Sequence, residues 1–363
     1  MRKVFWVTDC IVSSLGETTD ENYSNIFSGV TGVSEQNGNY VALGKRVDGG
    51  EDMTSFEALT AKTMHGALEN ITLPPARTLF LLSTTKGNIE LIDETVDARR
   101  ISLHDTASSI AKKFGFDHFN VVSNACISGV LAIITAKRLI QSGLFDHAVI
   151  AGSDVVTEFV LSGFRSLQAL SNGVCKPFDA NRDGINLGES CGVVILSSSP
   201  ESLGGTKQIA VLGEGVTNDA NHISGPSRTG EELAFAIRSA LNRSDLQVEN
   251  IDFISAHGTG TVYNDEMEAK AFHLAGLSNT PLHSLKGYYG HTLGAAGILE
   301  SIIAVRQLQR NEAIATKGFE RLGVSHPVRV ACKSEATPMK RILKTASGFG
   351  GCNAAIIFEK QFD

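Results

Sequence analysis

The chain has few of the features that mark a membrane protein or a secreted protein. Its 363 residues include 1 tryptophan, 8 prolines and 6 cysteines. Apolar runs such as residues 148–151 fall far short of the about 20 residues that a membrane-spanning helix needs. Asp9 interrupts the apolar run near the N-terminus, which argues against a secretory signal. The sequence therefore predicts no membrane span.

The cysteines and the charge exclude further classes. Cysteines at positions 10, 126, 175, 191, 332 and 352 are neither paired like metal ligands nor dense enough for a disulfide scaffold. We therefore expect no metal site and a reducing, cytoplasmic setting. The formal net charge is -7 and no long basic run occurs, which argues against nucleic acid as the main partner.

Hydrophobic residues make up 42% of the chain, and it contains 36 glycines. The chain can therefore bury a large core, in one large domain or in two closely packed domains. Strands are predicted at 4–7, 78–82, 121–122, 148–151, 193–196, 209–212, 251–256, 282–284, 341–347 and 353–358, and helices at 20–27, 104–114, 130–141, 231–241, 265–275 and 295–308. Both halves repeat the order strand, helix, strand, helix on either side of a divide at 197–206. This alternation predicts an α/β fold.

Cys126 is the most informative residue. It lies among small residues in the run VVSNACISGV (121–130), where a strand is predicted to turn into a buried helix. A thiol at a helix N-terminus experiences the positive end of the helix dipole, which lowers its pKa. Seen alone, such a cysteine is more often inert packing. The pattern nevertheless makes Cys126 a candidate nucleophile.

Two histidines strengthen this interpretation because both lie in glycine-rich runs. His257 is in SAHGTGT (255–261), and His291 is in KGYYGHTLGAAG (286–297). A third glycine run, SGFGGCN (347–353), lies near the end of the chain. A thiol, two imidazoles and loops that expose backbone N–H groups suit acyl transfer. The histidines at 222, 273 and 283 lack such a context and are expected to be structural or at the surface.

Together with DANRDG (179–184) and LGE (187–189), these motifs resemble, in order and approximate spacing, those of the β-ketoacyl-acyl-carrier-protein synthases. The resemblance extends over essentially the whole chain. It implies the thiolase-like fold, an α/β architecture of two similar halves in five layers. We place the half with the nucleophile at residues 1–203 and the half with the two histidines at 204–363.

The resemblance also implies an activity, which is the decarboxylative Claisen condensation of an acyl thioester with malonyl-acyl-carrier protein. In this family a cysteine, here Cys126, takes the acyl group. Backbone N–H groups of Cys126 and Phe349 would form the oxyanion hole, with Gly350 allowing close approach and Phe349 gating the pocket. His257 and His291 would donate hydrogen bonds to the malonyl thioester carbonyl as enolate charge develops.

Supporting roles carry over in the same way. Lys286 matches the active-site lysine of the family, and Glu300 would pair with it. Asp265 and Glu268 match buried acidic positions and fall on one helix face. The phosphopantetheine arm would be bound by Thr259 and Thr261. No cofactor belongs to the chain itself, since phosphopantetheine is carried by the acyl carrier protein.

The implied partners are an acyl carrier protein and either a second copy of the chain or a related ketosynthase-like subunit. An acidic carrier needs a local basic patch, for which the candidates are Lys112, Lys113, Lys137, Arg138, Arg165, Lys176 and Arg182. The stretch before Cys126 is shorter than is usual in the family, Cys352 stands where threonine is usual, and Asn186 and Ser190 depart from the common pattern. These differences favour a specialised pathway, such as one for aryl polyenes or other polyketide-like lipids, over primary fatty-acid synthesis.

Three alternatives stay open. A non-catalytic partner subunit of a heterodimeric synthase would usually lack the nucleophile, and Cys126 is present. A thiolase-type acyltransferase uses a second cysteine and one histidine, and Cys352 fits that pattern whereas the two histidine motifs do not. A Cys-His acyl hydrolase has no need of a second histidine, so His291 separates it.

Overall fold

The sheet contains two sets of five strands, and the strands of the two sets are arranged in the same order and with the same pairing directions. The computed structural model describes residues 2–45, 47, 49–50, 53–92, 98–219 and 221–361. The first set runs β1 (Phe5–Ser13), β8 (Ser190–Ser197), β6 (His147–Asp154), β4 (Thr78–Ser83) and β5 (His118–Val122). The second runs β9 (Ile209–Asn218), β16 (Cys352–Lys360), β15 (Arg341–Gly348), β10 (Phe253–Ser255) and β11 (Pro281–His283), with β13 (Arg329–Val330) beyond it.

The strand directions repeat as well. In each set the first two pairings are antiparallel and the last two are parallel. The pairing of Phe5 with Ala210 joins the two sets into one 11-stranded sheet. The predicted repetition of strand and helix order is therefore present as two like halves in space.

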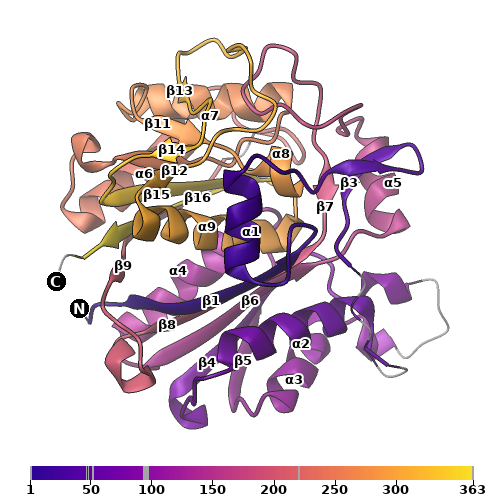
Figure 1. The fold of residues 1–363 in the computed structure, drawn as a ribbon, viewed down its shortest axis with the longest axis vertical. Coiled ribbons are helices and arrows are strands. Elements are labelled where there is room, and N and C mark those ends of the chain that lie inside the picture. Colours follow the sequence, from indigo (N-terminus) through magenta and orange to yellow (C-terminus); the bar gives the residue numbers. More distant parts are fainter. Residues whose placement is uncertain are drawn as a thin grey trace.

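Helices complete five layers (Figure 1). The central layer consists of α4 (Ser128–Gln141) and α9 (Ala296–Arg310), which pack between the two sets of strands. The outer face of the first set is covered by α2 (Ser55–Leu68) and α3 (Leu103–Lys113), and that of the second by α6 (Glu231–Ser244) and α7 (Val262–Leu274). The α/β architecture in five layers agrees with the prediction, while the boundary between residues 203 and 204 stays a prediction.

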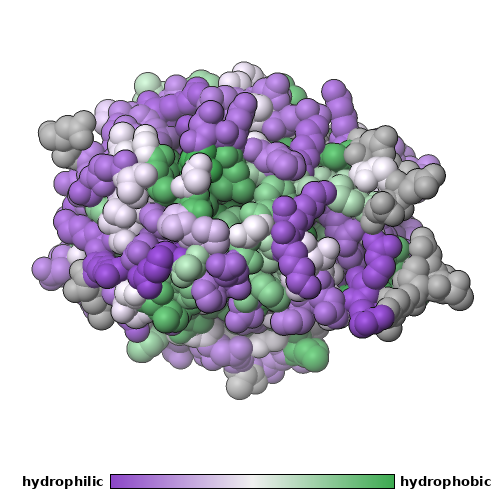
Figure 2. All heavy atoms as spheres, turned by 90° about the horizontal axis from the view of Figure 1, so that it is seen from below, coloured by the Kyte–Doolittle hydropathy of each residue, from purple (hydrophilic) through white to green (hydrophobic). Residues whose placement is uncertain are grey.

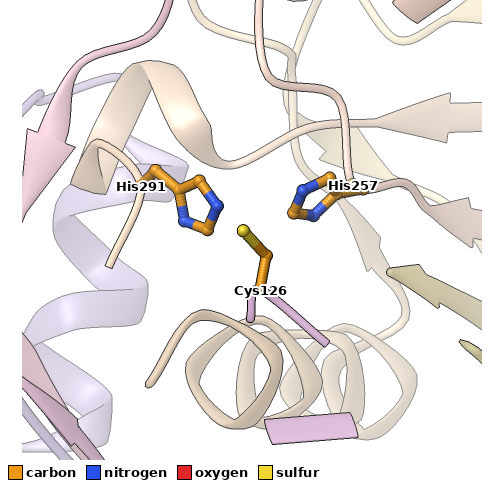
Figure 3. A group of neighbouring side chains, drawn as sticks. All are labelled: Cys126, His257 and His291. Carbon is orange, nitrogen blue, oxygen red and sulfur yellow. The ribbon is translucent and has the colours of Figure 1, made fainter. Parts of the chain in front are cut away.

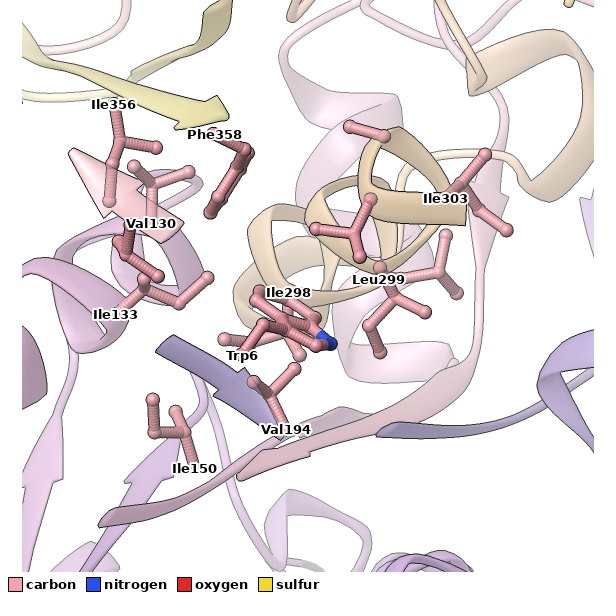
Figure 4. Packing of buried hydrophobic residues seen from close by; sticks show 14 of the residues in the cluster. Trp6, Val130, Ile133, Ile150, Val194, Ile298, Leu299, Ile303, Ile356 and Phe358 are labelled. Carbon is pink, nitrogen blue, oxygen red and sulfur yellow. The ribbon is translucent and has the colours of Figure 1, made fainter. Parts of the chain in front are cut away.

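The main core lies around the central helices (Figure 4). Ile298 and Leu299 of α9 and Val130 of α4 are buried between residues of both strand sets. The Trp6 ring meets Phe358 edge-on at a centroid distance of 5.5 Å, across the line where the two halves join. Each such large side chain contributes about 1.5–3 kcal/mol on burial, so the central layer stabilises both halves together.

The central helices cross at two glycines. A Cβ atom placed on Gly297 would lie 2.5 Å from the Val130 backbone nitrogen, and one on Gly129 would lie 2.6 Å from the Ile298 nitrogen. Only residues without a side chain allow the two backbones to come this close. The crossing fixes the N-terminal end of α4 against the N-terminal end of α9.

Several shorter elements complete the fold: α1 (Thr19–Phe27), β2 (Ser34–Gln36), β3 (Asn39–Ala42), α5 (Glu158–Ser166), β7 (Leu187–Gly188), α8 (Lys286–Tyr289), β12 (Glu312–Ala313) and β14 (Glu335–Ala336). Of these, only α1 was predicted. The first strand is longer than expected and continues to Ser13 through Asp9, because Asp9 bonds Trp6 Nε1 and pairs with Arg306. Seen from the side of α2 and α3, the surface is mostly hydrophilic, with hydrophobic areas among the polar side chains (Figure 2).

Candidate active site

A tight turn between β5 and α4 presents Cys126. Ala125, just before it, has a φ of 45°, which is strained for a residue with a side chain. The Ser128 hydroxyl stabilises the turn by donating to the Ala125 carbonyl at 2.6 Å and accepting the Asn124 N–H at 2.8 Å. The predicted helix therefore begins at Ser128, two residues after the cysteine.

The second half of the chain supplies both histidines. His257 follows β10, and His291 follows the single turn of α8. Their rings lie 5.2 Å apart between centroids and nearly perpendicular, at 81°. The Cys126 sulfur points between them (Figure 3), and ligand atoms of the three residues all lie within 4.8 Å of one another. The structure thus brings together the three residues that were predicted to carry the chemistry.

The thiol of Cys126 differs from its prediction. Burial raises its pKa to about 12, and this effect outweighs the lowering by the Lys286 charge and by the Phe349 backbone N–H. The sequence predicted a lowered pKa for this thiol, and that prediction is wrong. Packing around the sulfur removes the water that would solvate a thiolate, and this raises the pKa more than nearby charges and N–H groups lower it. The thiol is protonated at neutral pH, so its nucleophilic form requires a base within reach.

His291 is oriented as a donor. Its Nδ1 accepts the Leu293 N–H at 3.1 Å, so the proton of the neutral ring is on Nε2. That Nε2 is buried and has no hydrogen-bond partner among the described residues. Burial, and then the Lys286 charge, lower the pKa of both His257 and His291 well below the usual value. Both rings are therefore neutral near pH 7, and each can donate one N–H.

Two buried carboxylates hold the loop of His257. Glu268 accepts the His257 N–H at 2.9 Å and the Gly258 N–H at 2.6 Å. Asp265 accepts the N–H groups of Thr259 and Phe178 at 2.9 and 2.7 Å. Both are fully buried on α7, so neither is an exposed helix charge. Their position fits the predicted supporting role.

A buried chain of charges lies behind the histidines. The ammonium group of Lys286 bonds the carboxylate of Glu300, as predicted, and donates to the His257 carbonyl oxygen at 3.0 Å. Sequence reasoning missed its third member, Lys344, whose Nζ lies 2.7 Å from Glu300 Oε2. The signal for Lys344 was a cation that directly follows two apolar residues inside the predicted strand 341–347.

A cavity of about 280 Å³ opens onto the sulfur and both imidazoles. Thr259 and Thr261 line it, with their hydroxyl oxygens 2.8 Å apart. Phe349 also lines it, is 40% exposed and stacks on Phe164 at 6.0 Å, so it is not a core residue. Gly350 has a φ of 82° and free space around its α-carbon, which suits a turn that can move.

Gly348 packs closely against the backbone N–H of Cys126. A Cβ atom on Gly348 would lie 3.0 Å from that nitrogen. Cys126 and the two imidazoles are also the one group among the described residues that could hold a metal ion. We do not assign them as metal ligands, because two neutral imidazoles beside a protonated thiol fit acid-base chemistry directly.

Two like α/β halves, with a thiol from one and two imidazoles from the other, define the thiolase-like class. Family models match residues 82–202 as the beta-ketoacyl synthase N-terminal domain and residues 209–320 as its C-terminal domain. The chain is 33% identical to 3-oxoacyl-[acyl-carrier-protein] synthase 2 of Rhizobium meliloti over 76% of its own length and 68% of that protein. The chain belongs to the β-ketoacyl synthase family.

Other relatives extend this picture. The polyketide biosynthesis malonyl-ACP decarboxylase PksF of Bacillus subtilis is 33% identical over 66% of this chain and 60% of that protein. The chain thus spans only about two thirds of the length of the curated relatives it matches. Among solved structures, the ketosynthase ApeO with its chain length factor ApeC from Xenorhabdus doucetiae has a TM-score of 0.87 at 26% identity, covering 99% of this chain and 98% of that one. The ishigamide ketosynthase/chain length factor has a TM-score of 0.91 at 25% identity, covering 99% and 100%.

Proposed function

We propose that this protein catalyses the decarboxylative Claisen condensation of an acyl thioester with malonyl-acyl-carrier protein, giving a β-ketoacyl-carrier protein. The observation that carries the proposal is the convergence of the Cys126 sulfur with the imidazoles of His257 and His291 in one cavity. A nucleophile and two neutral N–H donors are what this two-step reaction requires.

In the first step Cys126 takes the acyl group. A neutral imidazole accepts the thiol proton, the sulfur attacks the thioester carbon, and the N–H groups of Cys126 and Phe349 stabilise the oxyanion. The bond from carbon to the carrier sulfur then breaks, and the carrier thiolate leaves with the proton. Because burial raises the pKa of the resting thiol, the attack requires this transfer of the proton to an imidazole.

In the second step malonyl-carrier occupies the same cavity. The bond between the α-carbon and the carboxylate breaks, CO2 leaves, and the electron pair forms a thioester enolate. N–H groups of His257 and His291 stabilise the enolate oxygen. The enolate carbon then attacks the acyl carbon on Cys126, and the cysteine thiolate leaves. The developing charge is met by groups already in place, which lowers the barrier rather than only binding the substrate.

The phosphopantetheine arm would be bound at the cavity by Thr259 and Thr261, and Phe349 would move to admit the acyl chain. We propose no cofactor belonging to the chain. Among the basic candidates for carrier docking, Lys137 was a wrong choice, since it is buried and bonded to Glu214. Arg165 is more exposed and lies next to Phe164 at the cavity, so we propose it as a carrier contact.

A second subunit is also part of the proposal. β5, whose end leads to Cys126, is the last strand of the sheet and pairs only with β4 among the described strands. Its free edge suits pairing with a second copy or a related subunit. The six cysteines are free, in keeping with the proposed reducing cytoplasm. No helix in the described part of the chain is long and apolar enough to cross a membrane.

A decarboxylase is the second candidate, favoured by the similarity to the malonyl-ACP decarboxylase PksF. It would need the two imidazoles and no acylated cysteine. The presence of Cys126 at the cavity favours condensation. The similarity to a polyketide biosynthesis protein, and to two structures that pair a ketosynthase with a chain length factor, supports a specialised pathway over primary fatty-acid synthesis.

The test follows acylation and CO2 release separately. Wild type should form an acyl adduct and release CO2 from malonyl-carrier with formation of the β-ketoacyl product. Cys126→Ala should lose the adduct and the product, while the control Cys332→Ala, at an exposed cysteine, should keep both. His291→Ala should keep the adduct and lose CO2 release, while the control His273→Ala should behave as wild type. Absence of any adduct on wild type would contradict the proposal.

A further inference from the structure

We infer that Lys344 is a positioning residue of this site. Its ammonium group completes a buried chain of charges, Lys286–Glu300–Lys344, that fixes the strand end before His257 against the helix after His291. The inference rests on the proposed function and extends it to a residue outside the motifs that identified the site.

Two of the carbonyl groups that Lys344 binds belong to the backbone that leads to His257. The Nζ of Lys344 donates to the carbonyl oxygens of Ser255 at 3.2 Å, Ala256 at 3.3 Å and Thr345 at 2.7 Å. Lys286 donates to the next carbonyl, that of His257. The two lysines therefore hold three consecutive carbonyl groups at the end of β10. A methylene chain could not replace these bonds.

Glu300 connects this strand end to the other histidine. Its two carboxylate oxygens bond Lys286 and Lys344 separately. Glu300 lies on α9, which begins five residues after His291. Both lysines and the carboxylate are at most 2% exposed. A rigid charged bridge therefore spans the two elements whose spacing sets the distance between the imidazoles.

The bridge carries an excess positive charge. Two ammonium groups share one carboxylate, and the hydrogen-bond partners of Lys344 are carbonyl oxygens, which accept. Burial lowers the pKa of Lys344, and the neighbouring Glu300 raises it. Burying a net charge is costly unless it is paired and hydrogen-bonded. Glu268 is a further acidic group that interacts with Lys344. The two ammonium groups lie beside the site where negative charge develops in the reaction, so they can stabilise that charge.

That charge acts on both imidazoles. After burial and the charge of Lys286, Lys344 is a further cause that lowers the pKa of His257 and of His291. It thereby keeps the rings neutral, so that each can donate to an enolate oxygen. The other titratable groups on the elements packed around the rings are Lys86, Cys126, Asp154, Asp265, Glu268, His283, Lys286 and Glu300.

The experiment compares Lys344→Met with wild type across pH, using the full-length protein and malonyl-carrier. At an effective dielectric of about 20, a unit charge about 8 Å from a titrating group shifts the pKa of that group by about 1.5 units. The acid limb of CO2 release should therefore move upward by about 1.5 pH units in the variant. The rate at neutral pH should change little through titration, because the pKa values of both imidazoles lie well below the usual value. Acyl transfer to Cys126 should change by less than about threefold on the same scale.

Lys137→Met is the matched control, because Lys137 is also a buried lysine bonded to a buried glutamate, Glu214, outside this site. It should lose stability but keep the acid limb of wild type. Lys344→Arg keeps the positive charge, so its acid limb should lie at the same pH as that of wild type. This variant tests the inference if Lys344→Met does not fold. The inference would be overturned if the acid limb of the pH profile stayed in place in Lys344→Met. It would also be overturned if the acid limb moved as far in Lys344→Arg as in Lys344→Met. Failure of wild type to release CO2 would instead contradict the proposed function.

Discussion

The crossing of α4 and α9 gives a prediction that joins stability to catalysis. Replacing Gly297 by alanine places a methyl group 2.5 Å from the Val130 nitrogen and 3.0 Å from the Gly129 carbonyl carbon. Both contacts are with backbone, so no flexible side chain can move aside. The two helices must separate by several tenths of an ångström, at the level of the helix N-termini that follow Cys126 and His291.

The magnitude follows from two opposing effects. Overpacking a well-filled core costs about 1–3 kcal/mol, and contact with backbone belongs at the upper end of that range. Alanine gains about 0.5–1 kcal/mol over glycine within a helix. Gly297→Ala should therefore lower the free energy of unfolding by about 1–2 kcal/mol. It should also slow condensation, because the thiol moves away from His291.

The assay is equilibrium denaturation in urea, monitored by circular dichroism. The m-values of the two proteins are compared first, and the urea midpoints are then converted into free energies of unfolding. Gly163→Ala is the control, since it is also a helical glycine but has nothing within 4 Å of the added methyl group. It should stabilise α5 by about 0.5–1 kcal/mol. Equal effects of the two substitutions, or a Gly297→Ala protein as stable and active as wild type, would refute the argument from close helix approach.

Further predictions concern titration and the cavity entrance. Alkylation of Cys126 by iodoacetamide should be slow at pH 7 and rise with pH to well above pH 9, because the pKa of the thiol is about 12; a plateau near pH 8 would contradict this. The pKa of Glu268 is raised to about 6 by burial, so the folded state binds more protons than the unfolded one between about pH 4.5 and 6. Glu268 should therefore cost about 2 kcal/mol of stability as pH rises through that window, a slope that Glu268→Gln should reduce in urea titrations at each pH. Phe349→Ala should accelerate alkylation of Cys126, since it removes a ring from the cavity wall, while destabilising the fold by no more than about 1 kcal/mol; unchanged alkylation would show that the ring does not limit access.

The fold class and the three reactive residues could be predicted from the sequence, because both depend on local patterns. Apolar strands alternating with helices are visible in any window, and glycine-rich runs mark the loops of His257 and His291. Short polar strands such as β2 were missed since their three residues are exposed and show no alternation. The strained turn at Ala125 gave no signal, because alanine rarely adopts a positive φ.

Tertiary packing accounts for what the sequence did not supply. The pKa of Cys126 depends on burial by segments distant in sequence, and local reasoning saw only the helix terminus. Lys344 shows no helical or motif spacing to Lys286 and Glu300, which it meets only after β15 aligns beside β10. Conversely, the sequence suggested Lys137 as a surface residue for carrier docking, whereas the fold buries it against Glu214.

The ratio of CO2 released to β-ketoacyl product formed is the measurement that tests the central claim most directly. Wild-type protein would be supplied with saturating acyl-carrier and malonyl-carrier, and both products would be quantified by mass spectrometry in the same reaction. We predict a ratio of one in wild type, since each enolate formed beside His257 and His291 is captured by the acyl group on Cys126. Release of CO2 without condensed product would contradict the account and indicate a decarboxylase.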